Sequence, residues 1–186
     1  DVPGGQLLDS RPTVIPPGQM IQHFIGREII APKGSFDPTQ AILMDFRCDQ
    51  SRGIHFIYFL PFSDRIALVE STMFASRREP DSFFEEAITQ YLSTHCGVVK
   101  FTTERTETGA IPLGRLPPSL STMVGLGGNG GAIRPSSGYA FTFIQKQVSD
   151  IIARASKAAV TTDREGPLAV RSPHKSVDLW MDESNL

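Results

Sequence analysis

The longest apolar run of the chain, residues 54–62 (IHFIYFLPF), constrains the fold most strongly. As a strand, the run would carry apolar residues on both of its faces, which is typical of a strand inside a sheet rather than at its edge. At nine residues, with a histidine and a proline in it, the run is too short to span a bilayer. Residues 65–72 (RIALVEST) also have a strand pattern and follow after only Ser63 and Asp64, so the two segments predict a tight β-hairpin.

Four other segments have strand character: residues 22–30, 41–47, 98–107 and 122–126. A helix is expected from Ser82, where Ser82–Glu85 fits a capping box, to Gly97. Its apolar face would consist of Phe84, Ile88, Tyr91 and Leu92. A second amphipathic helix is expected after Ser137, ending near residue 159. This alternation predicts an α/β or α+β fold with a mixed or antiparallel sheet in its first half.

Charge and composition exclude several classes of protein. The formal net charge is -2, so no general attraction to nucleic acid or to anionic lipid is expected, and no nucleic-acid partner. Cys48 and Cys96 lie in no C-x-x-C pattern and the four histidines are scattered, so neither a disulfide framework nor a metal site is expected. The chain opens without a methionine or a signal peptide, and we expect a fragment of a longer protein.

A glycine-rich stretch, residues 125–139 (GLGGNGGAIRPSSGY), contains G-x-G-x-x-G at Gly125, Gly127 and Gly130. In a dinucleotide-binding turn the third glycine already lies in a helix. Here Pro135 suits a helix start, so that match is interpreted as accidental. Two interpretations then have equal weight. In the first, a helix starting near Pro135 presents free N–H groups to a phosphate or a flavin. In the second, the glycines only permit tight turns.

The end of this stretch, residues 128–139 (GNGGAIRPSSGY), resembles the second FAD-contacting motif of the hydroxylase-like flavoproteins. The closest version is that of the lycopene cyclases, G-x-x-A-G-x-x-H-P-S-T-G-Y. Five further segments resemble that family in the same order: residues 7–12 (LLDSRP), 36–47 (FDPTQAILMDFR), 56–72 (FIYFLPFSDRIALVEST), 104–114 (ERTETGAIPLG) and 177–183 (VDLWMDE). The chain departs from the family in lacking its N-terminal G-x-G-x-x-G unit and its last helices. Arg134 also stands where cyclases carry histidine.

The resemblance implies a flavoprotein that cyclises the ends of lycopene or a related acyclic carotenoid. It implies FAD in its reduced form, with NAD(P)H as the electron source. The implied FAD contacts are Asp9, Arg11, Gly128, Asn129, Gly130, Gly131, Pro135, Ser136, Gly138 and Tyr139. Asn129 stands where the wider flavoprotein group has an acidic residue.

The same resemblance implies four regions along the chain. Residues 1–12 would end the FAD-binding strand region, and residues 13–120 would form a substrate-binding sheet domain. Residues 121–160 would hold the second FAD motif and its helix, as the C-terminal part of a Rossmann-like domain. Residues 161–186 would start a helical region.

Cyclisation adds a proton to a terminal C=C bond, closes a ring through a cation and releases a proton. The site must therefore hold a neutral carboxylic acid, which an apolar pocket favours by raising the pKa of the acid. Glu70 shares a strand face with Ile66 and Leu68 and falls on the first glutamate of the family's E-E-T motif. Ser71 replaces the second acid. Without the resemblance, a glutamate near a strand end is more often solvated.

Glu107 is the second candidate acid. Arg105 lies on the same side of its strand, so Glu107 fits either a catalytic role or a surface ion pair. Asp45 and Arg47 stand likewise on one side of their strand, and we expect a structural pair.

Four aromatic residues are expected to line the substrate tunnel: Phe56, Tyr58, Phe62 and Phe74. Aromatic strand positions are also ordinary core. The apolar substrate implies peripheral contact with a membrane, in the cytoplasm of a bacterium or in the plastid of a plant. Two alternatives stay open: an FAD-dependent monooxygenase or prenyl reductase of the same fold, and a truncated, inactive fragment.

Overall fold

The computed structural model describes residues 7–12, 14–114 and 123–162, with side chains placed to residue 157. The chain divides into two compact units, residues 1–147 and 148–186. Of the expected helical region at residues 161–186, only the first two residues are described, as the end of a helix. The segment 177–183 therefore lies outside the described residues.

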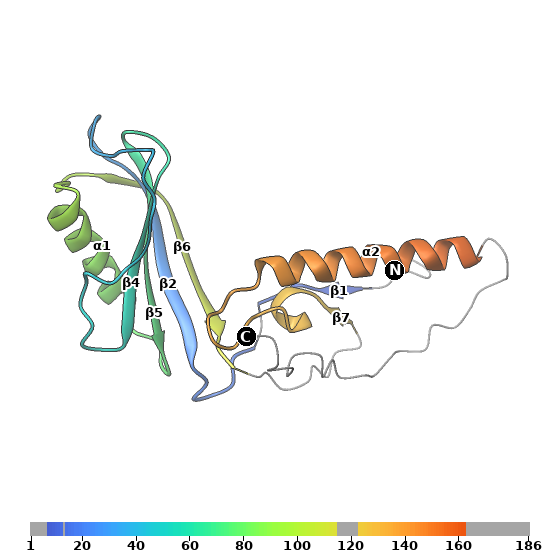
Figure 1. The fold of residues 1–186 in the computed structure, drawn as a ribbon. Helices are drawn as coiled ribbons and strands as arrows, with labels where there is room; N and C mark the ends of the chain where they lie inside the picture. The colour runs from blue at the N-terminus through green and yellow to red at the C-terminus, as the bar shows by residue number, and fades with distance from the viewer. Residues whose placement is uncertain (1–6, 13, 115–122, 163–186) are drawn as a thin grey trace, which may run out of the picture. The chain divides into compact units, whose positions relative to one another are not determined.

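An antiparallel sheet of five strands forms most of the first unit (Figure 1). Its strands are β2 (Ile21–Ile30), β3 (Ile42–Asp45), β4 (Ile54–Pro61), β5 (Ile66–Ala75) and β6 (Thr102–Pro112), in the order β3-β4-β5-β2-β6. The expected hairpin is confirmed, because β4 pairs with β5 and the Phe62 amide donates to the Ile66 carbonyl at 2.8 Å. The apolar run lies inside the sheet, between β3 and β5.

Helix α1 (Asp81–His95) packs along one face of this sheet, as Figure 1 shows. The expected apolar face is buried: Phe84, Ile88, Tyr91 and Leu92. The expected capping box is wrong. The N-cap residue is Pro80 and no side chain caps the helix, because the helix begins at Asp81 and Ser82 already lies in its first turn. Gly97 ends the helix as expected, with a left-handed φ of 68° that glycine adopts readily.

Strands β5 and β6 run further than expected, to Ala75 and Pro112, and β7 (Val124–Gly125) is shorter than expected. Two other strand boundaries differ for a local reason. Strand β3 ends at Asp45 rather than at residue 47, because the Asp45 carboxylate accepts a hydrogen bond from the Arg47 amide at 3.1 Å and turns the chain. Strand β6 begins at Thr102 rather than at residue 98. The Val98 amide instead donates to the Leu92 carbonyl at the end of α1, at 3.0 Å.

A second, short sheet joins two distant parts of the chain. Strand β1 (Leu8–Asp9) pairs in parallel with β7 (Val124–Gly125), and the 3-10 helix η1 (Gly127–Gly130) follows β7. No α-helix continues from this turn, in agreement with the rejection of the dinucleotide motif. The mixed α+β fold expected from the sequence is confirmed.

Helix α2 spans Phe141–Thr162, so the expected helix start near Pro135 is wrong. Residues 135–137 instead form a turn in which the Arg134 carbonyl accepts the amides of Ser137 and Gly138. Gly138 then has a left-handed φ of 72°, which interrupts the chain before α2 begins.

Candidate functional site

Strand alternation places Glu70 on the face of the five-stranded sheet opposite α1, which we call the distal face. Glu70 stands beside Tyr58 of β4 on one side and Gly26 of β2 on the other. Gly26 in turn pairs with Glu107 of β6. The four residues Tyr58, Glu70, Gly26 and Glu107 therefore form a row across four strands, which we call the carboxylate row. The two candidate acids lie in the same row.

The glycine in this row leaves room for the Glu107 side chain. A Cβ atom on Gly26 would stand 2.9 Å from Glu107 Cγ and 3.0 Å from Glu107 Oε1, closer than ordinary van der Waals contact. The Glu107 carboxylate thus lies over Gly26, in the strip between the two glutamates. The expected pair with Arg105 is present, with 3.7 Å between Arg105 Nη2 and Glu107 Oε2. Arg105 Nε also stands 3.8 Å from Glu28.

Glu70 is half-buried, and its environment favours the neutral acid. Burial raises the pKa of Glu70 because it disfavours the charged carboxylate. The Thr72 hydroxyl donates a hydrogen bond to Glu70 Oε1 at 2.7 Å and opposes this rise, whereas the nearby charge of Glu107 adds to it. Burial is the largest of these effects, so the pKa of Glu70 lies above its ordinary value.

An aromatic cluster adjoins the carboxylate row on the distal face. Phe56 is fully buried at its centre, with ring centroids 5.3 Å from Tyr58, 5.5 Å from Phe74 and 5.6 Å from Phe46. The structure thus brings together three of the four expected aromatic residues. Phe62 does not join them, because it lies in the turn after β4 and is 59% exposed.

Sequence reasoning missed three residues of this face: Phe24, Gly26 and Phe46. Phe24 lies over a second glycine, since a Cβ on Gly109 would stand 2.6 Å from Phe24 Cζ. The signal for Phe46 was its place in MDFR, near the end of the strand expected at residues 41–47. Gly26 gave a weaker signal, as an isolated glycine within a strand pattern, which can mark a close approach of another group.

Ser71, which stands in place of the second acid, points to the other face of the sheet. It is fully buried on the α1 side, and its Oγ lies 2.8 Å from Nε2 of the buried His55. His55 Nδ1 lies 2.8 Å from the Asp49 carbonyl. Ser71 therefore contributes nothing to the carboxylate row.

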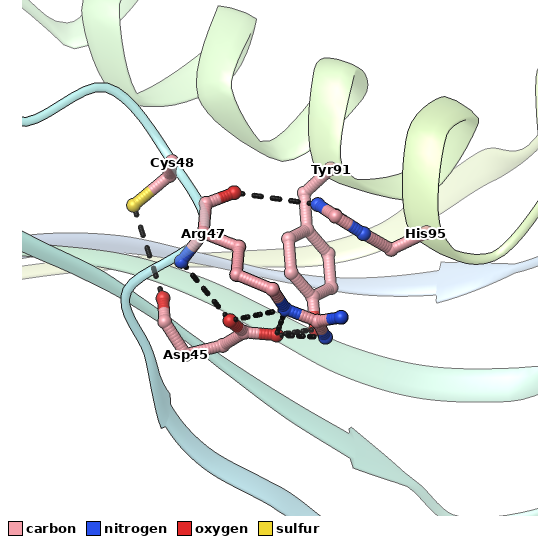
Figure 2. A network of polar contacts seen from close by, with 5 residues as sticks. All are labelled: Asp45, Arg47, Cys48, Tyr91 and His95. Carbon is pink, nitrogen blue, oxygen red and sulfur yellow. Dashed lines mark hydrogen bonds and ion pairs between the residues drawn. The ribbon is translucent and has the colours of Figure 1, made fainter.

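Figure 2 shows the expected Asp45–Arg47 pair, also on the α1 side. The buried Asp45 carboxylate accepts hydrogen bonds from Arg47 Nη2 at 2.6 Å and from the Tyr91 hydroxyl at 2.8 Å. His95 lies 3.3 Å from the Arg47 carbonyl, which ties the loop after β3 to α1. The hydrogen bonds from Arg47 and Tyr91 lower the pKa of Asp45, the Arg47 bond most of all. A cleft beside this network, lined among others by Arg47, Arg52 and His95, lies away from Glu70 across the sheet.

The segments LLDSRP and GNGG lie side by side because β1 pairs with β7. Asp9 is buried and accepts hydrogen bonds from Arg11 Nε and Nη2, both at 2.8 Å, which help to lower the pKa of Asp9 to about 2. The Asn129 side-chain amide donates to the Arg11 carbonyl at 3.0 Å. The structure therefore brings together three of the expected FAD contacts, Asp9, Arg11 and Asn129.

The remaining expected contacts follow in the same loop. Gly128 and Gly130 belong to η1, and Gly131 caps it with a left-handed φ of 75° and open space where a Cβ would stand. Pro135, Ser136, Gly138 and Tyr139 form the next turn, with Tyr139 exposed.

Loop bonds already use several of the backbone amides expected to face a flavin. Gly131, Ala132, Arg134 and Ser137 donate to the carbonyls of Gly128, Gly127, Tyr139 and Arg134. An approaching group would thus meet the Gly131 backbone and the side chains of this loop rather than a row of free amides.

Residues 2–185 match the family described as lycopene cyclase protein. The lycopene beta cyclase, chloroplastic/chromoplastic, of Capsicum annuum is 31% identical over 136 residues, which cover 66% of this chain and 27% of that protein. The chloroplastic lycopene beta cyclase of Nicotiana tabacum is 28% identical over 137 residues, with the same shares of 66% and 27%. The chain thus spans 27% of the length of these curated relatives.

A solved structure shares the fold. The geranylgeranyl bacteriochlorophyll reductase-like protein of Thermoplasma acidophilum superimposes with a TM-score of 0.50 at 15% identity, over 68% of this chain and 31% of that chain. At this identity the likeness concerns the fold alone.

Proposed function

We propose, because this chain belongs to the lycopene cyclase family, that it carries the acid site of an enzyme that cyclises the ends of lycopene or a related acyclic carotenoid. By "full-length protein" we mean this chain within a sequence as long as its relatives. The reaction is an isomerisation, an intramolecular lyase-type step. A proton adds to a terminal C=C bond, the cation closes an ionone ring, and a proton leaves, with no net transfer of electrons.

One observation carries this proposal: Glu70 is a half-buried carboxyl group on the distal face, next to an aromatic cluster. Burial raises the pKa of Glu70 and so favours the neutral acid, which is the form that can protonate an alkene. The rings of Phe56, Tyr58 and Phe74 pack beside its row and supply an apolar surface for a hydrocarbon chain. Aromatic faces also attract a cation, which is the charge that develops during ring closure.

FAD is the cofactor that we propose for the full-length protein, in its reduced form, with NAD(P)H as the electron source. The loop geometry fits such a group, because Asn129 joins the DSRP segment to the glycine stretch and the space over Gly131 is open. Asp9 and Arg11 with residues 128–131 and 135–139 would hold it. When bound, a reduced flavin would supply electron density that can stabilise a cation.

The substrate suggests where the enzyme works. Lycopene is an apolar hydrocarbon that dissolves in membranes, so we propose peripheral contact between the full-length protein and a membrane. Within the described part of the chain, no helix is long and apolar enough to cross a bilayer. The matched plant relatives are described as chloroplastic, and a plastid location is proposed for a plant protein.

The experiment that tests this function gives lycopene to the purified full-length protein under reducing conditions. A cyclase forms monocyclic or bicyclic carotenoid with the mass of lycopene, without consuming NAD(P)H in proportion to product. A monooxygenase or prenyl reductase of the same fold would consume NAD(P)H in proportion to product, one for each oxygen inserted or each C=C bond reduced, and would change the mass of the carotenoid. Product of altered mass would contradict the proposal, and so would unchanged lycopene with protein that retains FAD.

A further inference from the structure

We propose that Glu107 is a positioning residue that holds Glu70 in its protonated form, and that the absence of a side chain at residue 26 is what allows it to do so. This inference rests on the proposed function, in which Glu70 delivers the proton. In this role Glu107 and Gly26 act through Glu70 and do not contact the reacting atoms.

The geometry of the carboxylate row is the first argument. Adjacent strands of a sheet lie about 4.8 Å apart, so the backbones of Glu70 and Glu107, two strands apart, are separated by about 10 Å. The Glu107 carboxylate narrows this gap because it lies over Gly26, with Oε1 3.0 Å from the place where a Cβ would be. Any other residue at position 26 would fill that place.

The backbone does not require glycine at position 26. Gly26 is absent from the glycines with left-handed φ, in contrast to Gly97 or Gly131, and lies in the regular ladder of β2. A glycine inside a strand weakens it and is typical of a close approach by another group. At Gly26 the approaching group is the side chain of Glu107.

The charges around Glu70 are the second argument. The titratable and charged groups facing it are Tyr58 from β4, Glu28 from β2, and Arg105 and Glu107 from β6. Arg105 is 67% exposed and is shared between Glu28 and Glu107 at 3.8 and 3.7 Å, and it reaches Glu70 by no described contact. Two neighbouring carboxyl groups resist a second ionisation, and the more buried one keeps its proton.

The same repulsion would reset the site after each turnover. When Glu70 gives its proton to the alkene carbon, two carboxylates face each other across Gly26. Ring closure is followed by loss of one proton from a carbon next to the cation. Return of one proton to Glu70 relieves the repulsion, so the cycle consumes no proton and no electron.

The test measures the protonation of Glu70 directly, by infrared spectroscopy of the full-length protein as a function of pH. The band of the protonated carboxyl is assigned by its loss in Glu70→Gln. Glu107→Gln removes the negative charge and should move the midpoint of that band about one pH unit lower. The alkaline limb of cyclisation activity should move by the same amount. Glu104→Gln, the same change at an exposed position of β6, is the matched control and should leave the midpoint in place.

Gly26→Ala is the second variant and keeps every charge. The three atoms nearest to the added methyl group are all side-chain atoms of Glu107, so the methyl group should displace the carboxylate and lower the midpoint. In a Glu107→Ala background, where no carboxylate remains to be displaced, Gly26→Ala should cause no further shift.

An unchanged midpoint in both Glu107→Gln and Gly26→Ala would overturn the inference while leaving Glu70 as the acid. Full cyclisation by Glu70→Gln would instead overturn the proposed function. The two failures are therefore distinguishable.

Discussion

Glu70 and Ser71 are consecutive residues of β5 whose side chains lie on opposite faces of the sheet. Glu70 stands in the carboxylate row and accepts a hydrogen bond from Thr72, whereas Ser71 is buried beneath α1 with its Oγ 2.8 Å from His55 Nε2. Because successive residues of a strand point to opposite faces, Ser71 cannot share a proton with Glu70. The partner of Glu70 must be sought across the strands, where Glu107 lies, rather than along the chain.

Ser71→Ala should therefore affect stability and not catalysis. The Asp49 carbonyl can only accept a hydrogen bond, so His55 Nδ1 donates to it and Nε2 accepts from the Ser71 hydroxyl. Loss of that hydroxyl leaves a buried acceptor unpaired, which should cost about 1–3 kcal/mol. Thermal unfolding and turnover of the full-length variant measure the two effects, with the exposed Ser93→Ala as control. A large loss of turnover in correctly folded Ser71→Ala would contradict this assignment.

His55 should make the stability of the sheet depend on pH. Burial lowers the pKa of His55 in the folded protein, so the unfolded chain, with a pKa of about 6.5, binds the proton first as the pH falls. The stabilisation is complete above pH ~6.5 and is lost progressively at lower pH, towards the pKa of the folded state. Urea unfolding from pH 7.5 to 5.5 should show this decline, and His55→Gln should reduce its slope. His23 is also buried with a lowered pKa and should contribute in the same direction.

The exposed His95→Gln is the control for this pH dependence. It removes a histidine from α1 without touching the buried pair of His55 and Ser71. An equal slope in wild type, His55→Gln and His95→Gln would show that the buried histidine is not responsible.

Tyr91→Phe should destabilise the contact between α1 and β3. The Tyr91 hydroxyl donates to the buried carboxylate of Asp45, and hydrogen bonds to charged groups contribute about 1.5–3 kcal/mol. Asp45 keeps its bonds to Arg47, so we expect the lower part of that range. Tyr139→Phe removes a hydroxyl from an exposed ring and should have little effect. Equal unfolding midpoints for the two variants would contradict the role of Tyr91.

Gly131→Val tests the proposed flavin site. Among the described residues no atom lies within 4 Å of the place where a Cβ on Gly131 would stand, so a bound group is what the side chain would exclude. We expect the full-length variant to lose FAD on purification. Valine at a left-handed φ also strains the backbone, and Gly18→Val is the matched control, because Gly18 has a φ of 76° and open space as well. Retention of FAD by Gly131→Val, or equal loss in both variants, would contradict the site.

The sequence was sufficient for what local patterns determine. Alternation predicted the β4–β5 hairpin and the face that Glu70 shares with Leu68, and helical periodicity predicted the buried face of α1. The carboxylate row was out of reach, because the order β5-β2-β6 depends on pairings between distant segments. The start of α2 was misplaced because a proline suits a turn as well as a helix start. Only the structure shows that Gly138, three residues after Pro135, has a left-handed φ.

The central claim is that Glu70 supplies the proton, and the most direct measurement counts the cyclic carotenoid that full-length Glu70→Gln makes from lycopene under reducing conditions. Glutamine keeps the shape of the side chain and removes its acidic proton, so cyclisation should fall about 10²–10⁴-fold while folding and FAD retention stay near normal. Glu104→Gln, the same change at an exposed position of β6, is the control and should remain active. Cyclisation by Glu70→Gln at a near wild-type rate would contradict the account, and an inactive Glu107→Gln beside it would exchange the roles of the two glutamates.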